Sequence, residues 1–357
     1  MRSEWGRSGL GARVQGVHLN GSVPLKSAEE VFRTVAGILG PWLRRIPDGE
    51  TGVRSGWISW QTPFLTACPA LEQREAHLPY SRGGPISLRE GASGSDVHFE
   101  ELGYAAAAAQ SYPVFKELKA AGVIPRRCRF QVSLPTPLAT VTAFIRQQDR
   151  SAVEPAYEQR ILEELGEITA SIQHTELAVQ WDTAIEFAIL EKVMPAHFED
   201  ARDGVLVRLR RLGDLVPEDV ELGYHLCYGD AGHRHFKEPE DAGLLVEVAN
   251  DICASLGRPV NWVHLPVPRE RADPAYFAPL GESRLDPETE LYLGLVHLTD
   301  GAEGARQRMK TALQVVPGFG VATECGLGRR PPETIPDLLR LHAQVAAPLT
   351  AERLPPQ

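Results

Sequence analysis

Two patterns of apolar residues alternate along the chain. Short apolar runs with the length of buried strands occupy residues 14–20, 42–46, 129–134, 177–181, 220–226, 260–265, 291–298 and 319–323. Between them, longer segments with helical spacing of apolar residues occupy 27–39, 99–121, 156–173, 198–212, 239–256, 302–315 and 333–346. Ser27, followed by Glu29 and Glu30, is typical of a helix start. The pattern predicts eight strands, most of them followed by a helix.

This repeated strand-then-helix order predicts an α/β fold, a (β/α)8 TIM barrel formed by residues 1–357 as a single domain. Barrels of this class reach this length as one unit. The competing arrangement is a doubly wound open sheet. No glycine-rich dinucleotide loop follows the first predicted strand, which favours the barrel.

Residues 52–97 interrupt the regular alternation after the second predicted strand. The segment is rich in proline and glycine and contains Trp57 and Trp60. We expect an irregular insertion. Because loops at the catalytic rim of a barrel often cover substrate, a lid is one interpretation, and a structural flap with buried tryptophans is the other.

The composition of the chain argues against some classes of binding partner. The chain has 43% hydrophobic and 24% charged residues, a net charge of −10 and a pI of about 5.6, without a basic stripe. We therefore expect no nucleic-acid partner. No apolar run approaches the ~20 residues of a membrane span, and the N-terminus lacks a signal-type apolar core, so we expect no membrane association and a cytoplasmic location. The five cysteines form no disulfide pattern, which fits a reducing compartment.

Metal-ligand residues stand at two predicted strand ends. His225 and Cys227, two residues apart, project from the same face of an extended strand, and Cys325 follows the last predicted strand. The C-terminal strand ends of a barrel converge on one rim. An imidazole and two thiolates favour zinc, and three protein ligands leave a position for substrate. The sequence predicts a catalytic zinc site if these segments meet.

Further polar residues follow other predicted strands: Ser22, Glu50, Asp182, His264 and His297. Each has an ordinary structural alternative. Asp182 could cap the next helix, Glu50 could belong to a turn with Asp48 and Gly49, and His297 alone is more typical of a buried core histidine.

Two more histidines, His233 and His235, lie in a polar segment after Cys227. Both are potential extra ligands, although a solvated loop is the favoured interpretation.

Several segments together resemble the catalytic barrel of cobalamin-independent methionine synthase and its short single-barrel relatives. They are the His-x-Cys of 225–227, Cys-Gly-Leu at 325–327, Gly-Ser at 21–22, Asp-Gly-Glu at 48–50 and Gln-Trp-Asp at 180–182. Their order and spacing match from about residue 14 to 346. The His-x-Cys followed late by Cys-Gly-Leu is the most specific element.

This resemblance implies a zinc-dependent methyl or alkyl transfer to a thiol. In that family zinc is held by one histidine, two cysteines and a glutamate, which implies His225, Cys227 and Cys325 here. The glutamate position holds His264, which we carry over as a zinc ligand. The resemblance also implies that Ser22, Glu50 and Asp182 bind the amino-acid head of a homocysteine-like substrate, and that His297 handles a proton near the leaving group.

Departures from the family pattern bear on the reaction. Histidine in place of glutamate leaves the zinc site one unit less negative and a bound thiolate less nucleophilic, so we expect either an acceptor other than homocysteine or a different reaction. The folate-binding N-terminal barrel of full-length members has no counterpart, and Gly328 stands where a basic residue is usual. A corrinoid or another small methyl donor is therefore favoured over folate. The alternative function is a zinc-dependent lyase or hydrolase of a small amino-acid-derived substrate.

Overall fold

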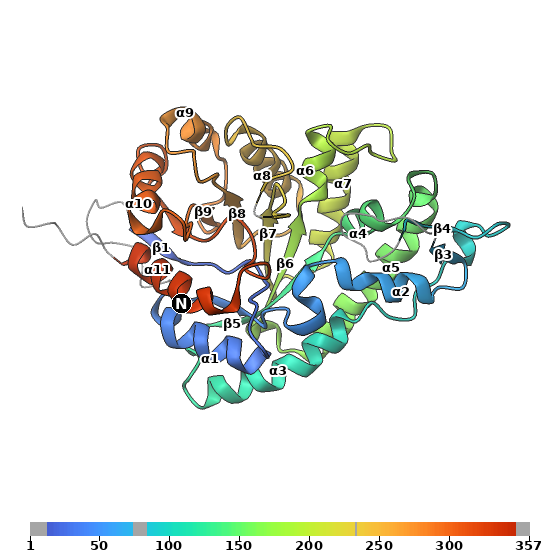
Figure 1. Ribbon diagram of the computed structural model, residues 1–357, viewed down its shortest axis with the longest axis horizontal. Coiled ribbons are helices and arrows are strands. Elements are labelled where there is room, and N and C mark those ends of the chain that lie inside the picture. The colour runs from blue at the N-terminus through green and yellow to red at the C-terminus, as the bar shows by residue number, and fades with distance from the viewer. Residues whose placement is uncertain (1–12, 74–83, 233, 348–357) are drawn as a thin grey trace, which may run out of the picture.

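The computed structural model describes residues 13–73, 84–232 and 234–347 (Figure 1). One sheet contains eight parallel strands: β1 (Arg13–Val17), β2 (Arg45–Pro47), β5 (Arg129–Pro135), β6 (Leu177–Thr183), β7 (Glu221–Leu226), β8 (Trp262–Pro266), β9 (Glu290–Gly294) and β10 (Gly318–Val321). They correspond one to one to the eight predicted strands.

The sheet curls into a ring. Its strand order is β1-β10-β9-β8-β7-β6-β5-β2, so each strand lies beside its predecessor in the chain. Between β1 and β2, the two ends of this order, isolated parallel bridges join Val17 to Leu43 and Ser22 to Gly49. The (β/α)8 prediction is confirmed, and the open doubly wound alternative is excluded.

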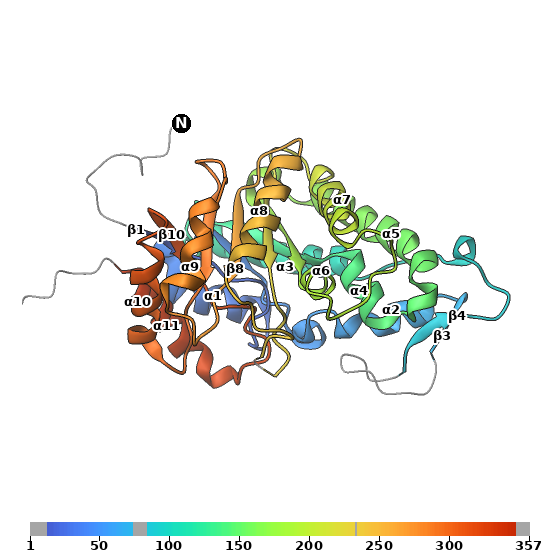
Figure 2. The ribbon, with the colours of Figure 1, turned by 90° about the horizontal axis from the view of Figure 1, so that it is seen from above.

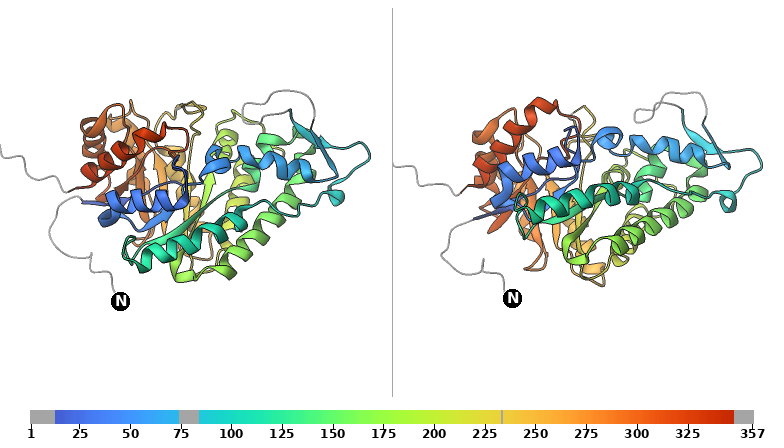
Figure 3. Two further views of the ribbon diagram at one scale, coloured as in Figure 1. Left: turned by 60° about the horizontal axis from the view of Figure 1, so that its bottom comes forward. Right: turned by 90° about the horizontal axis from the view of Figure 1, so that it is seen from below.

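Helices surround the strands (Figures 1 and 2). The main ones are α1 (Ala28–Leu39), α3 (Tyr104–Ala120), α5 (Arg150–Ser171), α7 (Ala201–Asp214), α8 (Gly243–Ser255), α10 (Gly301–Ala312) and α11 (Ile335–Ala346). Neighbouring helices pack together around the ring: α11 on α1, α1 on α3 and α3 on α5 (Figure 3). Ser27 caps α1 as predicted, because its hydroxyl accepts the Glu30 N–H. No helix of the described chain is long and apolar enough to cross a membrane.

Several helices differ from the prediction. Helix α5 begins at Arg150 rather than at 156 and tolerates Pro155 near its start, where buried Val153 and Tyr157 anchor it in the core. Helices α4 (Pro137–Phe144) and α6 (Ile185–Leu190) were not predicted. They are buried on nearly every side, so their sequences lack the amphipathic period that reveals a surface helix.

The segment predicted as an irregular insertion has structure of its own. Outside residues 74–83, which are not described, it contains α2 (Thr62–Ala67) and a hairpin of β3 (Leu71–Gln73) and β4 (Ile86–Leu88). The hairpin extends away from the barrel (Figure 1). The hairpin was not predicted, because each of its strands pairs over only three residues.

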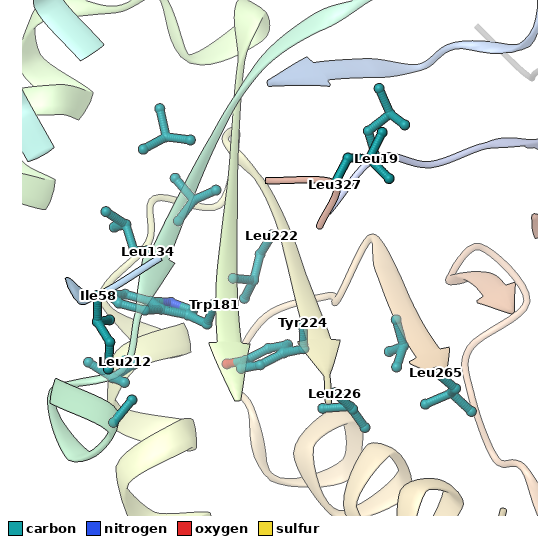
Figure 4. Close-up of a cluster of buried hydrophobic side chains, with 14 of the residues drawn as sticks. Leu19, Ile58, Leu134, Trp181, Leu212, Leu222, Tyr224, Leu226, Leu265 and Leu327 are labelled. Atoms are coloured by element: carbon teal, nitrogen blue, oxygen red, sulfur yellow. The ribbon is translucent and has the colours of Figure 1, made fainter. Parts of the chain in front are cut away.

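The two faces of the strands differ in chemistry. Outward side chains form the main apolar core against the helices; Leu134, Trp181, Leu222, Tyr224, Leu226 and Leu265 are among those in Figure 4. The Tyr224 hydroxyl donates to Leu209 O in α7, which fixes this direction. Inside the ring, Ala178, Trp262 and Tyr292 form a separate small cluster. The inner face is otherwise rich in buried polar groups.

Candidate metal centre and substrate pocket

Three predicted zinc ligands meet at the C-terminal mouth of the barrel. His225 lies in β7, Cys227 directly follows that strand, and Cys325 follows β10. One potential ligand atom from each lies within 4.8 Å of the others. The two sulfurs are 3.8 Å apart. Two sulfurs each about 2.3 Å from a tetrahedral zinc would be about 3.8 Å apart, so the pair has the spacing that zinc requires.

The polar atoms around this point also fit a cation. His225 Nε2 is buried and has no hydrogen-bond partner among the described residues. Such an atom is costly unless a ligand or ion satisfies it. Cys227 Sγ accepts the Gly229 N–H at 3.3 Å, an interaction that favours a thiolate. The donor set therefore fits zinc.

Burial and neighbouring groups shift the pKa values of His225 and Cys227. Burial, followed by the nearby His264 and His18, holds the pKa of His225 well below its ordinary value, which leaves a neutral imidazole. The hydrogen bond with Cys325, together with burial, raises the pKa of the Cys227 thiol well above its ordinary value. A bound divalent cation reverses this effect on a coordinating thiol.

His264 lies beside the group of three. Its Nδ1 is 2.7 Å from His225 Nδ1, and its Nε2 is 3.0 Å from Thr323 O. Both ring nitrogens thus have protein partners. The structure brings His264 next to His225 but does not include it among the clustered ligand atoms.

Ser22 is held by the segment that follows Cys325. Its hydroxyl accepts the Gly328 N–H at 3.2 Å, and its carbonyl accepts the Leu327 N–H at 2.7 Å. A Cβ on Gly326 would lie 2.4 Å from Ser22 Oγ, and one on Gly328 would lie 2.5 Å from Ser55 O. Glycine at 328, the departure noted in the sequence, is therefore required by this close packing.

Glu50 and Asp182 line the same pocket as the three clustered residues. Burial raises the pKa of both carboxyls well above their ordinary values, and for Glu50 the nearby Asp182 adds to the effect. A cation between the two carboxyls would oppose this shift and favour their ionised form. Asp182 accepts the Gln180 amide at 2.9 Å, while Glu50 has a left-handed φ of 47° and donates its N–H to Asp48 Oδ1.

His297 occupies a different position from the other predicted residues. It is not part of the pocket lining; its Nε2 donates to Val267 O at 2.9 Å, and its Nδ1 is 3.4 Å from Glu324. Burial lowers its pKa, and Glu324 opposes this shift. Glu324, the neighbour of Cys325, had no role in the sequence-based prediction.

His235 is not a solvated loop residue. Its side chain is 6% exposed and pairs with Glu324 at 3.3 Å and Glu238 at 3.0 Å. Although burial acts to lower its pKa, these two carboxylates raise it to about 9. The favoured interpretation was wrong because this polar segment folds back on the barrel mouth, where Phe236 stacks on Tyr228. His233 lies outside the described residues.

Trp57 and Arg329 are pocket residues whose roles the sequence did not predict. Against the larger effect of burial, the Trp57 side chain acts to lower the pKa of Asp182, and Arg329 lies 3.8 Å from Asp230 across the mouth. Trp57 has a positive φ of 59°, which is rare for a bulky residue. The free space that remains is about 50 Å³. That volume holds a few water molecules and is too small for an amino acid.

The sequence matches no protein-family model, and no curated protein matches it. Solved structures do match. A protein assigned as a vitamin-B12-independent methionine synthase from Listeria monocytogenes has a TM-score of 0.56 at 14% identity, covering 94% of this chain and 97% of that one. A B12-independent methionine synthase from Shewanella sp. W3-18-1, solved with selenomethionine, gives the same values.

A methyltransferase from Methanosarcina mazei has a TM-score of 0.52 at 12% identity, with 94% of each chain covered. These similarities extend over nearly the whole of each chain. The resemblance found in the sequence is thus confirmed in the fold, which is that of the B12-independent methionine synthase structures.

Proposed function

We propose that this protein is a zinc-dependent methyl or alkyl transferase that acts on the thiol of a small, amino-acid-like substrate. The observation that carries the proposal is the convergence of His225, Cys227 and Cys325 in one pocket with Glu50 and Asp182. The fold shared with methionine synthase-like and methyltransferase structures supports it.

The side chains suggest a division of labour. His225, Cys227 and Cys325 would hold zinc, which when bound lowers the pKa of a substrate thiol and favours the nucleophilic thiolate. Glu50 and Asp182 would bind the substrate ammonium, and Ser22 its carboxylate. Fixing both ends of the substrate head aligns sulfur with the alkyl donor, and alignment supplies much of the acceleration.

His297 is proposed to manage the proton of the leaving group. Because it is not among the residues that line the pocket, it would act at the donor side rather than at the amino-acid head. A corrinoid or another small methyl donor remains our proposal for that side. Burial lowers the pKa of His297, and Glu324, in contact with its ring, opposes that effect in the direction of the protonated imidazole that a general acid needs.

Substrate entry requires movement of the pocket wall, because the free space is only about 50 Å³. Ser55 and Trp57 in that wall come from the segment 52–97, for which a lid was one of the two interpretations. We propose that the first part of this segment opens to admit substrate. Asp182, which lines the pocket together with Trp57, would then be free to bind the substrate ammonium.

The test uses the full chain loaded with zinc. Homocysteine would be supplied with methylcobalamin or methyltetrahydrofolate, and S-methylated product measured by mass spectrometry. We expect product that depends on both substrates and on zinc. Full activity after complete metal removal would refute the proposal, and turnover of one organic substrate without any donor would support the lyase or hydrolase alternative.

A further inference from the structure

His225 and His264 are paired by the register of the barrel. They are directly opposite each other on the neighbouring strands β7 and β8, and both side chains face inward. Their ring centroids are 4.7 Å apart. Beyond His264, the chain that leaves β10 presents the Thr323 carbonyl. The segment after β10 and the strands β8 and β7 thus place a carbonyl, an imidazole and a second imidazole in a row.

The direction of the hydrogen bonds in this row follows from its last member. A carbonyl oxygen only accepts, so His264 Nε2, at 3.0 Å from Thr323 O, carries a proton. The Asn20 amide, 3.5 Å from the same nitrogen, donates to that carbonyl at 3.2 Å instead. A neutral imidazole has one N–H, so His264 Nδ1 is left as an acceptor.

His225 must then supply the donor. Its Nδ1 lies 2.7 Å from His264 Nδ1 and carries the proton that this bond requires. Its Nε2 is consequently a bare lone pair. That nitrogen is the buried atom without a partner, and a proton placed there would find no acceptor among the described residues.

Resting on the proposed zinc site, we infer that His264 is a positioning residue, not a zinc ligand. It fixes His225 in the tautomer that presents Nε2 to the metal. A histidine ligand whose second nitrogen is held by a carbonyl or carboxylate is a recurrent arrangement, and here a second imidazole takes that role. Gly294 leaves room for the row, because a Cβ there would lie 2.9 Å from His264 Nε2 and 2.8 Å from Thr323 O.

The experiment compares wild type with His264→Gln and His264→Phe. Glutamine offers an amide oxygen to His225 and an amide N–H to Thr323 but is a poor zinc ligand, whereas phenylalanine offers neither. Zinc dissociation constants would be measured by chelator competition, with circular dichroism to verify folding. X-ray absorption of the zinc-loaded wild type would count imidazoles at the metal.

We expect one imidazole and two sulfurs at zinc in wild type. His264→Phe should weaken zinc binding about 10- to 100-fold, the usual cost of losing an outer partner, and His264→Gln should recover most of that loss. Two imidazoles at zinc, or equal losses in both variants, would overturn the inference. A wild type that binds no zinc would instead refute the proposed function. If His264→Phe does not fold, the imidazole count and His264→Gln still decide.

Discussion

The outer and inner faces of the same eight strands show opposite ways of filling space. Outside, Leu222 and Trp181 belong to a continuous apolar layer under the helices. Inside, alternate residues of the same strands form a column of polar groups. His18 bonds Gln180 at 2.8 Å, and Gln180 in turn donates to Asp182 at 2.9 Å. Because successive residues of a strand point to opposite faces, neighbouring residues lie in these two different environments.

The polar column is anchored at the other end of the barrel. Arg45 reaches Glu221 at 2.5 Å and Glu290 at 2.8 Å, and its guanidinium lies 4.0 Å from the Trp262 ring centroid. Buried polar groups are usually paired, and the Trp262 indole links this end to the column by donating to Gln180 at 3.4 Å. The outer layer therefore stabilises the fold, while the inner column holds the site residues in place.

The largest expected effect is on the metal. Cys325→Ser should reduce zinc affinity by more than the ~100-fold that loss of an outer partner can cost, because it removes one of two sulfurs at the proposed site. Chelator competition measures this. The matched control is Cys253→Ser in α8, outside the site, which should bind zinc as wild type does. Equal zinc binding by both variants would contradict the ligand assignment.

On the outer face, Trp181→Ala should lower the free energy of unfolding by about 3–5 kcal/mol, since the fully buried indole leaves a large cavity. Urea unfolding gives this value. The exposed Val207→Ala should change it by less than about 0.5 kcal/mol. The folded Trp181→Ala variant should still bind one zinc. Loss of zinc binding without loss of stability would show that the outer and inner faces do not have separate roles.

Low pH should weaken one set of contacts among the outer helices, the hydrogen bonds of Glu154 in α5. Burial alone would raise the pKa of Glu154, but hydrogen bonds from Arg208 and His197 outweigh it and lower the pKa from 4.5 to about 2. A lowered carboxyl pKa stabilises the fold above the unfolded value, and this contribution is lost as pH falls from about 4.5 towards 2. It amounts to about 3 kcal/mol at 1.36 kcal/mol per pKa unit.

The stability difference between wild type and Glu154→Gln should therefore shrink over that pH range. Urea unfolding at several pH values measures it, with the exposed Glu303→Gln in α10 as the control. A difference that stays constant down to pH 2.5 would refute this electrostatic role.

The smallest expected effect tests the proposed role of the inner face in substrate binding. Asp182→Asn should keep zinc but weaken homocysteine binding about 10- to 100-fold, because one charged partner of the proposed ammonium site is lost. Isothermal titration measures the affinity. Binding of 4-mercaptobutanoate, which lacks the amine, should be nearly unchanged. An equal loss for both thiols would assign Asp182 to a role other than ammonium recognition.

Much of the outer layer could be predicted from sequence, because strand length and helical period follow directly from the burial of one face. The positions of His225, Cys227 and Cys325 were also accessible, since strand ends of a barrel share a rim. The positioning role that we infer for His264 was not, because a ligand and a positioning residue both require an imidazole, and the inference depends on the contact of His264 with Thr323 O. Trp57 was missed because its contact with Asp182 depends on an unusual backbone conformation.

The hydrogen-bonded contact between Ser22 and the segment 326–328 has a consequence for biosynthesis. It joins the first strand to the segment after the last one, and Cys325 lies 98 residues beyond Cys227. During synthesis on the ribosome, His225 and Cys227 emerge long before Cys325 has been made. The nascent chain therefore cannot offer the complete set of proposed donors until the last strand of the barrel has been made, so metal capture at the proposed site would not precede closure of the ring.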